Sequence, residues 1–217
     1  MENLAATPEM AYYCFEVLEH ELAITKNGEG NKKRKGAPLA APDPYAYNIP
    51  DDIECPLFVG WKKSSKDGSD ERLRGCKGTH GTLPLHEGLR QYALLSAFDD
   101  SRFRPVTEDE VPRLACTVNL LFAFEKCDDC FDWEVGPHGV RIDFYDSRNV
   151  QRSATFLPSV AVQFGYTRTQ TIERLVEKAG CDEPLTKKLV AKIKCIRFQS
   201  SEIHIPYEEY LQHKKKG

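Results

Sequence analysis

Residues 114–124 constrain the fold more than any other segment of this chain. Apolar side chains occupy both alternating sets of positions in this stretch, so both faces of an extended strand would be apolar. The two sets are Cys116, Val118, Leu120 and Phe122, and Ala115, Leu121 and Ala123. A strand of this kind is stable where other elements cover both of its faces. We therefore predict that this segment is a central strand of a sheet.

Strand and helix patterns alternate along the rest of the chain. Residues 56–63 and 72–78 have strand patterns, and the polar turn between them predicts an antiparallel hairpin. Residues 139–145 and 150–158 predict a second hairpin across the turn sequence DSRN. Further strands are expected at 193–198 and 201–207 around a turn at Gln199–Ser201, and helices at 11–24, 84–98, 107–111, 159–165, 169–179 and 184–192. Helices mixed with hairpins, without a Gly-rich phosphate loop, predict an α+β fold.

Composition narrows the class of protein. The 217 residues are 41% hydrophobic and 29% charged, which excludes a collagen, a fully disordered chain and a membrane bundle. No apolar run approaches the roughly 18 residues of a spanning helix, so no membrane association is expected. The N-terminus lacks a secretory signal pattern, so we expect a reducing compartment and free thiols. The formal net charge of −3 makes nucleic-acid binding unlikely as the main function.

A polar segment interrupts the predicted core. Residues 27–51 are dense in Gly, Pro and charge and predict a flexible insertion. Within it, the run Lys32, Lys33, Arg34 and Lys35 resembles a nuclear import signal, and the alternative is a solvated lysine run. We expect one domain at 10–211, preceded by a flexible N-terminus at 1–9 and followed by a basic tail at 212–217.

The sequence RLRGCKG at 72–78 is the most unusual local feature. Gly75 and Gly78 flank Cys76 and allow another group to approach the backbone closely. Arg74 and Lys77 add positive potential, which favours a thiolate if the thiol is exposed. One interpretation is a reactive thiol or an anion-binding turn, and the other is a cysteine that packs as a small hydrophobe.

The sequence DWEVGPHG at 132–139 offers a second candidate. A turn at Gly136–Gly139 would present His138 close to Trp133 and Glu134. His138 could act as a general base with Glu134 orienting its ring, and the alternative is an ordinary solvent-facing turn. A catalytic cysteine needs its base nearby in space, so this hypothesis depends on convergence with Cys76.

Two further clusters contain residue types that can bind ligands. Cys127 and Cys130 form a C-x-x-C pair without a second pair at zinc-site spacing, so we expect loop thiols, no metal and no cofactor. In the sequence DDSRFRP, Arg102 and Arg104 could bind an anion or could simply pair with Asp99 and Asp100.

Taken in order, several of these segments resemble the AMMECR protein family. The segments are PLFVGWK, RLRGCKG, LHEGLRQYAL, DSRFRP, DWEVGPHGVRIDF, RSATFLP and IRFQSSEI followed by YEEYL. The family hexapeptide L-R-G-C-I-G is matched except at Lys77, which stands where the family has isoleucine.

This resemblance implies an α+β domain of two subdomains with mixed or antiparallel sheets and a cleft between them. It also implies an intracellular protein of the nucleus and cytoplasm, without an established activity, and an association with Memo-like or radical-SAM proteins. The positions that it marks as a shared surface are Arg74, Gly75, Cys76, Gly78, Asp100, Ser101, Arg102, Phe103, Trp133, Glu134, Gly136, His138 and Gly139.

Two functional hypotheses follow. The first is a binding or regulatory module whose cleft recognises a protein, a peptide or a small anionic ligand. The second is an enzyme that uses Cys76 as a nucleophile or redox thiol, His138 as the base, Glu134 as the orienting group and Arg74 as an anion clamp. We favour the binding module, because only this one catalytic constellation is found.

Overall fold

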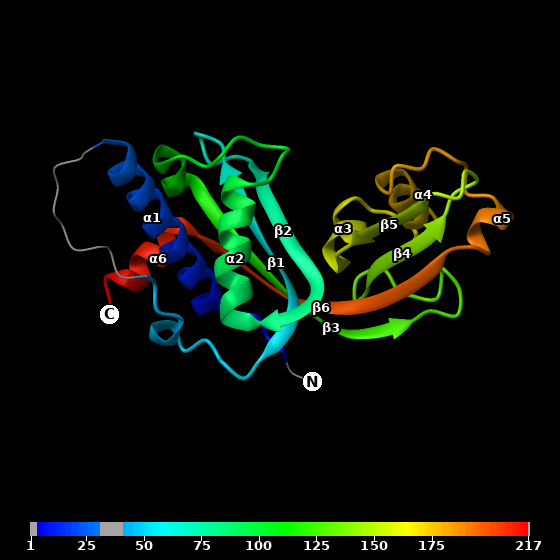
Figure 1. Ribbon diagram of the computed structural model, residues 1–217, viewed down its shortest axis with the longest axis horizontal. Coiled ribbons are helices and arrows are strands. Elements are labelled where there is room, and N and C mark those ends of the chain that lie inside the picture. Colours follow the sequence, from blue (N-terminus) through cyan, green and yellow to red (C-terminus); the bar gives the residue numbers. More distant parts are fainter. Residues whose placement is uncertain (1–3, 31–40, 217) are drawn as a thin grey trace. The chain divides into compact units, whose positions relative to one another are not determined.

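The computed structural model describes residues 4–30 and 41–216 and confirms the α+β class. Figure 1 labels its elements. The helices are α1 (Pro8–Gly30), α2 (Leu85–Phe98), α3 (Pro158–Gln163), α4 (Arg168–Lys178), α5 (Lys187–Val190) and α6 (Tyr207–Lys214), with 3-10 helices η1 (Pro44–Tyr47) and η2 (Glu108–Arg113). The strands are β1 (Glu54–Ser64), β2 (Glu71–Pro84), β3 (Leu114–Lys126), β4 (Gly139–Tyr145), β5 (Gln151–Phe156) and β6 (Lys194–Pro206).

The strands are hydrogen-bonded in the order β2-β1-β3-β6-β4-β5. The β1–β2, β1–β3, β4–β5 and β4–β6 pairs are antiparallel, which confirms both predicted hairpins. β3 is an inner strand, and every residue from Leu114 to Leu121 is buried. The prediction of a central strand covered on both faces is therefore confirmed for residues 114–121, whereas Phe122 is half-buried and Ala123 and Phe124 are exposed.

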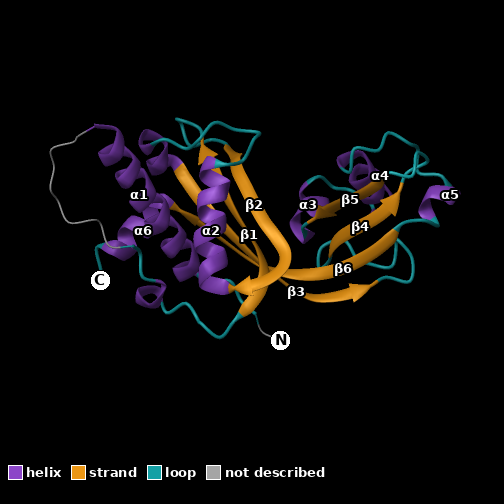
Figure 2. Cartoon of the chain, in the orientation of Figure 1, coloured by secondary structure: helices purple, strands orange, loops and turns teal. Residues whose placement is uncertain are grey.

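The chain forms two compact units. Among the described residues, the larger unit comprises 4–30, 41–120 and 201–216, and the smaller unit comprises Leu121–Ser200. Figure 2 shows that both units combine helices with strands. β3 and β6 each contribute residues to both units.

Aromatic side chains connect the helices to the sheet in the core of the larger unit. Trp61 of β1 is fully buried and its indole Nε1 donates to the Ala93 carbonyl of α2 at 2.9 Å. The Phe15 ring of α1 meets the Trp61 ring edge-on at 5.1 Å and stacks on Tyr210 of α6 at 5.2 Å. These contacts fix α1, α2 and α6 to the sheet, because an apolar stripe on a helix is stable when it is buried against another element.

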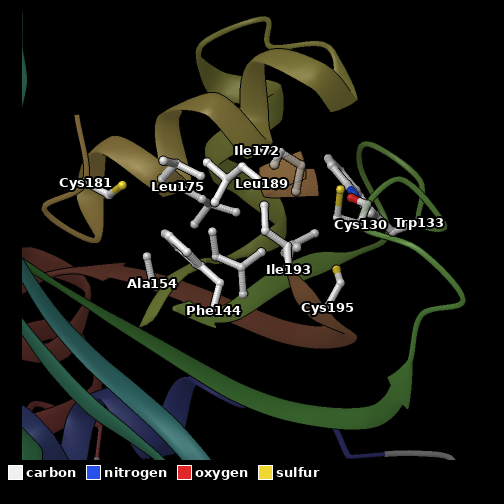
Figure 3. Packing of buried hydrophobic residues seen from close by; sticks show 13 residues of the cluster. Cys130, Trp133, Phe144, Ala154, Ile172, Leu175, Cys181, Leu189, Ile193 and Cys195 are labelled. Atoms are coloured by element: carbon white, nitrogen blue, oxygen red, sulfur yellow. The ribbon is translucent and has the colours of Figure 1, made fainter. Parts of the chain in front are cut away.

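The smaller unit has its own core, shown in Figure 3. Val140, Ile142 and Phe144 point inward from β4, as their alternation predicts. Ile172 and Leu175 of α4 pack against them. Two cysteines belong to this core: Cys195 of β6 is buried, and Cys130 lies in the loop between β3 and β4, as expected, but its side chain is also buried.

Two sequence expectations need correction. The turn at Gln199–Ser201 is wrong, because β6 runs unbroken from Lys194 to Pro206. The polar side chains that suggested a turn are accommodated in the strand, where the Ser201 hydroxyl accepts the Ala6 backbone N–H at 2.9 Å.

The boundaries of the expected insertion also differ from those of the described elements. α1 continues to Gly30, and η1 forms from Pro44 to Tyr47. Tyr47 and Ile49 are buried, and the Tyr47 ring lies 6.0 Å from that of Tyr13 in α1. Tyr47 and Ile49 therefore belong to the core of the larger unit, although they lie inside the expected insertion. Leu4 is also buried, so the N-terminus joins the core before residue 10.

Candidate functional site

The sequence RLRGCKG lies in β2, the first strand in the sheet order. An edge strand presents backbone N–H and C=O groups that have no partner strand and need other hydrogen bonds. Gly60 of β1 is the register partner of Cys76, and Val59 is the partner of Lys77. The outer backbone groups of Cys76 therefore face away from β1, at the open edge.

Asp100 and Arg102 satisfy that edge. The Cys76 N–H donates to Asp100 Oδ2 at 2.9 Å, and Arg102 Nη2 donates to the Cys76 carbonyl at 3.4 Å. Arg102 also holds the Asp100 carboxylate with two bonds, Nε to Oδ1 at 2.9 Å and Nη2 to Oδ2 at 2.6 Å. Asp100 is 6% exposed, and the Arg102 guanidinium holds its pKa well below the usual value. The sequence DSRFRP thus closes the edge of β2 at Cys76.

Ser96 of α2 occupies a position inside the β1–β2 ladder. Its hydroxyl accepts the Lys77 N–H at 2.8 Å and donates to the Val59 carbonyl at 2.7 Å. These two groups belong to register partners, so the hydroxyl links the two strands at this position. Gly75 allows this approach, because a Cβ at Gly75 would collide with the Ser96 carbonyl oxygen. Gly78 similarly leaves room for the Phe58 ring.

A basic pocket lies beside the start of β2. Its volume is about 340 Å³. Its lining residues are Lys63, Ser64, Ser65, Asp70, Arg72, Leu73, Arg74 and Arg113. We call this group the basic pocket. Four of its side chains are cationic and one is anionic, so the pocket favours a negatively charged ligand.

Glu110 organises the cations of the basic pocket. Its Oε1 accepts Lys63 Nζ at 2.5 Å and Arg74 Nε at 3.1 Å, and its Oε2 accepts Arg74 Nη2 at 2.9 Å. Burial would raise the pKa of Glu110, but the bonds from Arg74 and Lys63 outweigh it and lower the pKa to about 2. Glu110 therefore stays ionised at neutral pH and fixes the positions of both cations.

The Phe103 ring lies close to two arginines. The Arg102 and Arg74 guanidinium carbons lie 5.4 Å and 5.9 Å from its centroid, within the range of cation–π attraction. Ser101 is exposed in the same turn. The residues that the resemblance marks in DSRFRP are thus brought together with those marked in β2.

The second marked cluster belongs to the smaller unit. Trp133 is 2% exposed, and its Nε1 donates to the Cys130 carbonyl at 3.0 Å. Gly136 has φ +108°, which favours glycine, and a Cβ at Gly139 would meet the Phe198 ring. These contacts explain three of the marked positions by packing and backbone conformation.

The ring of His138 is fixed by backbone. Its Nδ1 accepts the Glu134 N–H at 3.0 Å. A neutral ring that accepts at Nδ1 carries its proton on Nε2, so it donates there instead of accepting. Protonation at Nδ1 would break the bond to Glu134. This arrangement weakens the hypothesis that His138 is a general base oriented by Glu134.

No group of three or more His, Cys, Asp or Glu side chains that could hold a metal ion occurs among residues 4–30 and 41–216. Likewise, no helix in this described part is long and apolar enough to span a membrane. The run Lys32, Lys33, Arg34 and Lys35 lies outside the described residues, so nuclear import stays a prediction.

Several residues of this site have no local sequence signal. The sequence TEDE at 107–110 indicates only that Glu110 caps a short helix, and no local pattern indicates Lys63, Arg113 or Ser96. The capping pattern is present, since the Thr107 N–H donates to Glu110 Oε2 at 3.1 Å. The sequence places Arg113 after an acidic cluster and next to the start of a predicted strand. This position does not predict that Arg113 lies near β2, because that proximity depends on tertiary structure.

The fold and the site define an α+β protein whose first edge strand carries a basic pocket beside a turn rich in arginine. The model of the AMMECR1 family matches residues 11–203, and the chain belongs to this family.

Its relatives share most of its length. An uncharacterised protein of Arabidopsis thaliana is 39% identical over 213 residues, covering 98% of this chain and 91% of the relative. An uncharacterised protein of Schizosaccharomyces pombe is 38% identical over 204 residues, covering 94% of each. The crystal structure of an uncharacterised protein from Pyrococcus horikoshii matches with a TM-score of 0.67 and 22% identity, over 93% of this chain and 95% of that one. This last likeness concerns the fold alone.

Proposed function

We propose that this protein is a binding module that recognises an anionic ligand, or an anionic group of a partner, through the basic pocket. The observation that carries the proposal is the arrangement of Lys63, Arg72, Arg74 and Arg113 around one hollow of about 340 Å³. Pockets of this size accept small ligands, and arginine pairs well with carboxylates and phosphates.

The ion pairs support binding over acid–base catalysis. Asp100 and Glu110 are the two buried carboxylates near β2, and both accept charge-assisted hydrogen bonds from arginine. A carboxylate held ionised in this way is a poor proton acceptor, because its pKa lies far below neutral pH. Both groups therefore position cations and backbone.

The proposal is tested by titration calorimetry with acetate, benzoate and inorganic phosphate. We expect at least one of these anions to bind with one-to-one stoichiometry. The double variant Arg72→Ala/Arg113→Ala should weaken that binding by about tenfold or more, because it removes two cations of the basic pocket.

Arg174→Ala is the control for the loss of an arginine charge outside the basic pocket. Arg174 lies in the smaller unit and forms an exposed ion pair with Glu177. Its removal should leave the affinity unchanged. Failure of all three anions to bind, or an equal loss in the control variant, would refute the proposed function.

The enzyme alternative rests on the half-buried Cys76 beside Arg102. The rate of Cys76 alkylation in the folded protein, measured at several pH values, distinguishes this alternative from the binding proposal. Mass spectrometry of the peptide that contains Cys76 measures the extent of alkylation. We expect the same pH profile in the wild type and in His138→Ala, because the His138 ring is bonded to its own turn. A profile that moves to higher pH in His138→Ala would favour the enzyme.

A further inference from the structure

We propose that the ligand of the basic pocket carries a phosphoryl dianion, as the monoester of a small molecule. This inference rests on the proposed function, because it names the chemical class of the ligand for the same site. Three observations support it: the charge balance of the pocket, the division of its cations into fixed and available ones, and the polar groups at its rim.

The charge balance favours a dianion. Lys63, Arg72, Arg74 and Arg113 line the pocket, and the carboxylates that pair with them are Asp70 and Glu110. Among the lining residues and Glu110, four cations therefore face two anions, which is an excess of two positive charges; the rim residue Asp67 does not line the pocket and is not counted. A carboxylate ligand would compensate one of them, whereas a phosphate monoester carries a charge of about −1.5 to −2 at neutral pH.

Two of the cations are fixed in place. The side chains of Lys63 and Arg74 are 27% and 12% exposed, and both are held by Glu110. Arg74 Nη2 also donates to the Pro105 carbonyl at 3.2 Å. Arg74 Nη1 is buried and has no hydrogen-bond acceptor among the described residues. The charge of Arg74 is thus held rigidly at the pocket and is only partly compensated.

The other two cations are available to a ligand. Arg113 makes no ion pair with any residue in the described part of the chain, and it lines the pocket from the end of η2. Arg72 pairs with Asp70 at 2.6 Å, but its side chain is 86% exposed. An exposed pair of this kind is weak and can be exchanged for a stronger anion. A ligand would therefore contact two cations with fixed positions, Lys63 and Arg74, and two arginines that are available for new hydrogen bonds, Arg72 and Arg113.

The rim of the pocket is an ordered turn with hydroxyl groups. Ser64 and Ser65 line it. Asp67 orders the turn, because its Oδ1 accepts the Ser65 and Ser69 hydroxyls at 2.5 and 2.8 Å and the Ser69 N–H at 3.2 Å. Ser64 lines the pocket together with the cations, and a serine hydroxyl can donate a hydrogen bond to an anion. Three phosphoryl oxygens can use donors from several directions, whereas a planar carboxylate has two oxygens in one plane.

The experiment compares matched ligands on the full chain at pH 7.5 by titration calorimetry. Phenyl phosphate and benzoate share an aromatic ring and differ in the anionic group, and inorganic phosphate reports the dianion without an ester. We expect phenyl phosphate to bind about tenfold or more tightly than benzoate, and at least as tightly as inorganic phosphate. Arg113→Ala should weaken phenyl phosphate binding by about tenfold, and Arg113→Lys should restore part of the loss.

The outcomes separate this inference from the proposed function. If benzoate binds as tightly as phenyl phosphate, the phosphoryl class is wrong and the anion-binding function stands. If inorganic phosphate binds and phenyl phosphate does not, the monoester is wrong. If Arg113→Ala changes the free energy of unfolding, Arg72→Ala replaces it, because Arg72 is almost fully exposed. An unchanged affinity in Arg72→Ala would then place the ligand elsewhere and overturn the inference.

Discussion

Gly75→Ala is expected to destabilise the protein by about 3 kcal/mol or more. The added Cβ would collide with the Ser96 carbonyl oxygen, which belongs to the backbone of α2 and has no rotamer to change. Relief would require α2 to move away from β2, and this movement would also break the bonds of the Ser96 hydroxyl to Lys77 and Val59. Urea denaturation followed by circular dichroism measures the loss.

Gly81→Ala is the matched control in the same strand. Gly81 is exposed, and the nearest atom to an added Cβ is the Thr79 hydroxyl oxygen at 3.4 Å. We expect its free energy of unfolding to stay within about 0.5 kcal/mol of the wild type. Equal stability of the two variants would show that α2 does not lie against Gly75 as described.

Asp100→Asn is expected to lower the free energy of unfolding by about 2 kcal/mol, which is the second of the two largest expected effects. The carboxylate accepts four hydrogen bonds, from the Cys76 and Arg102 N–H groups and twice from the Arg102 guanidinium. The amide has the same shape, but it loses the charge and places a donor opposite one of these donors. The neighbouring Asp99 is exposed, so Asp99→Asn is the control and should change stability little.

The same carboxylate predicts a dependence on pH. The pKa of Asp100 is lower in the folded state than the unfolded value of about 3.9. Its stabilisation is therefore complete well above pH 4 and is lost as the pH falls through the folded pKa. Acid titration of the free energy of unfolding should show a shallower decline below about pH 4 in Asp100→Asn than in the wild type. Parallel curves would contradict the assigned ion pair.

Local patterns were sufficient to predict most of the elements. The two apolar sets of β3 identified an inner strand, and alternation in β4 identified the residues that face the core of the smaller unit. The α2 boundaries also follow from its sequence, since the helix spans Leu85–Phe98. In each case the period of the apolar side chains matches one buried surface, and this information is contained in a short window.

The candidate site could be predicted only in part. The sequence singled out Arg74, Cys76 and Arg102, but their contacts depend on residues distant in the chain. Cys76 meets Asp100, which is 24 positions away, and Arg74 meets Glu110, which is 36 positions away. No local period records such a pairing. Similarly, the polar residues Gln199–Ser201 predict a turn although β6 continues through them. Polar residues in an inner strand have the same local pattern as a turn, and only their tertiary partners distinguish the two.

The position of the Ser96 hydroxyl has a consequence for cooperativity. Because the Ser96 hydroxyl of α2 accepts the Lys77 N–H, we expect docking of the helix to contribute to the protection of the Lys77 amide from solvent. Exchange of that amide with deuterium therefore reports detachment of the helix as well as separation of the strands. We therefore expect the β1–β2 hairpin and α2 to open together as one cooperative unit, so the stability of the basic pocket would depend on the contact between α2 and the sheet.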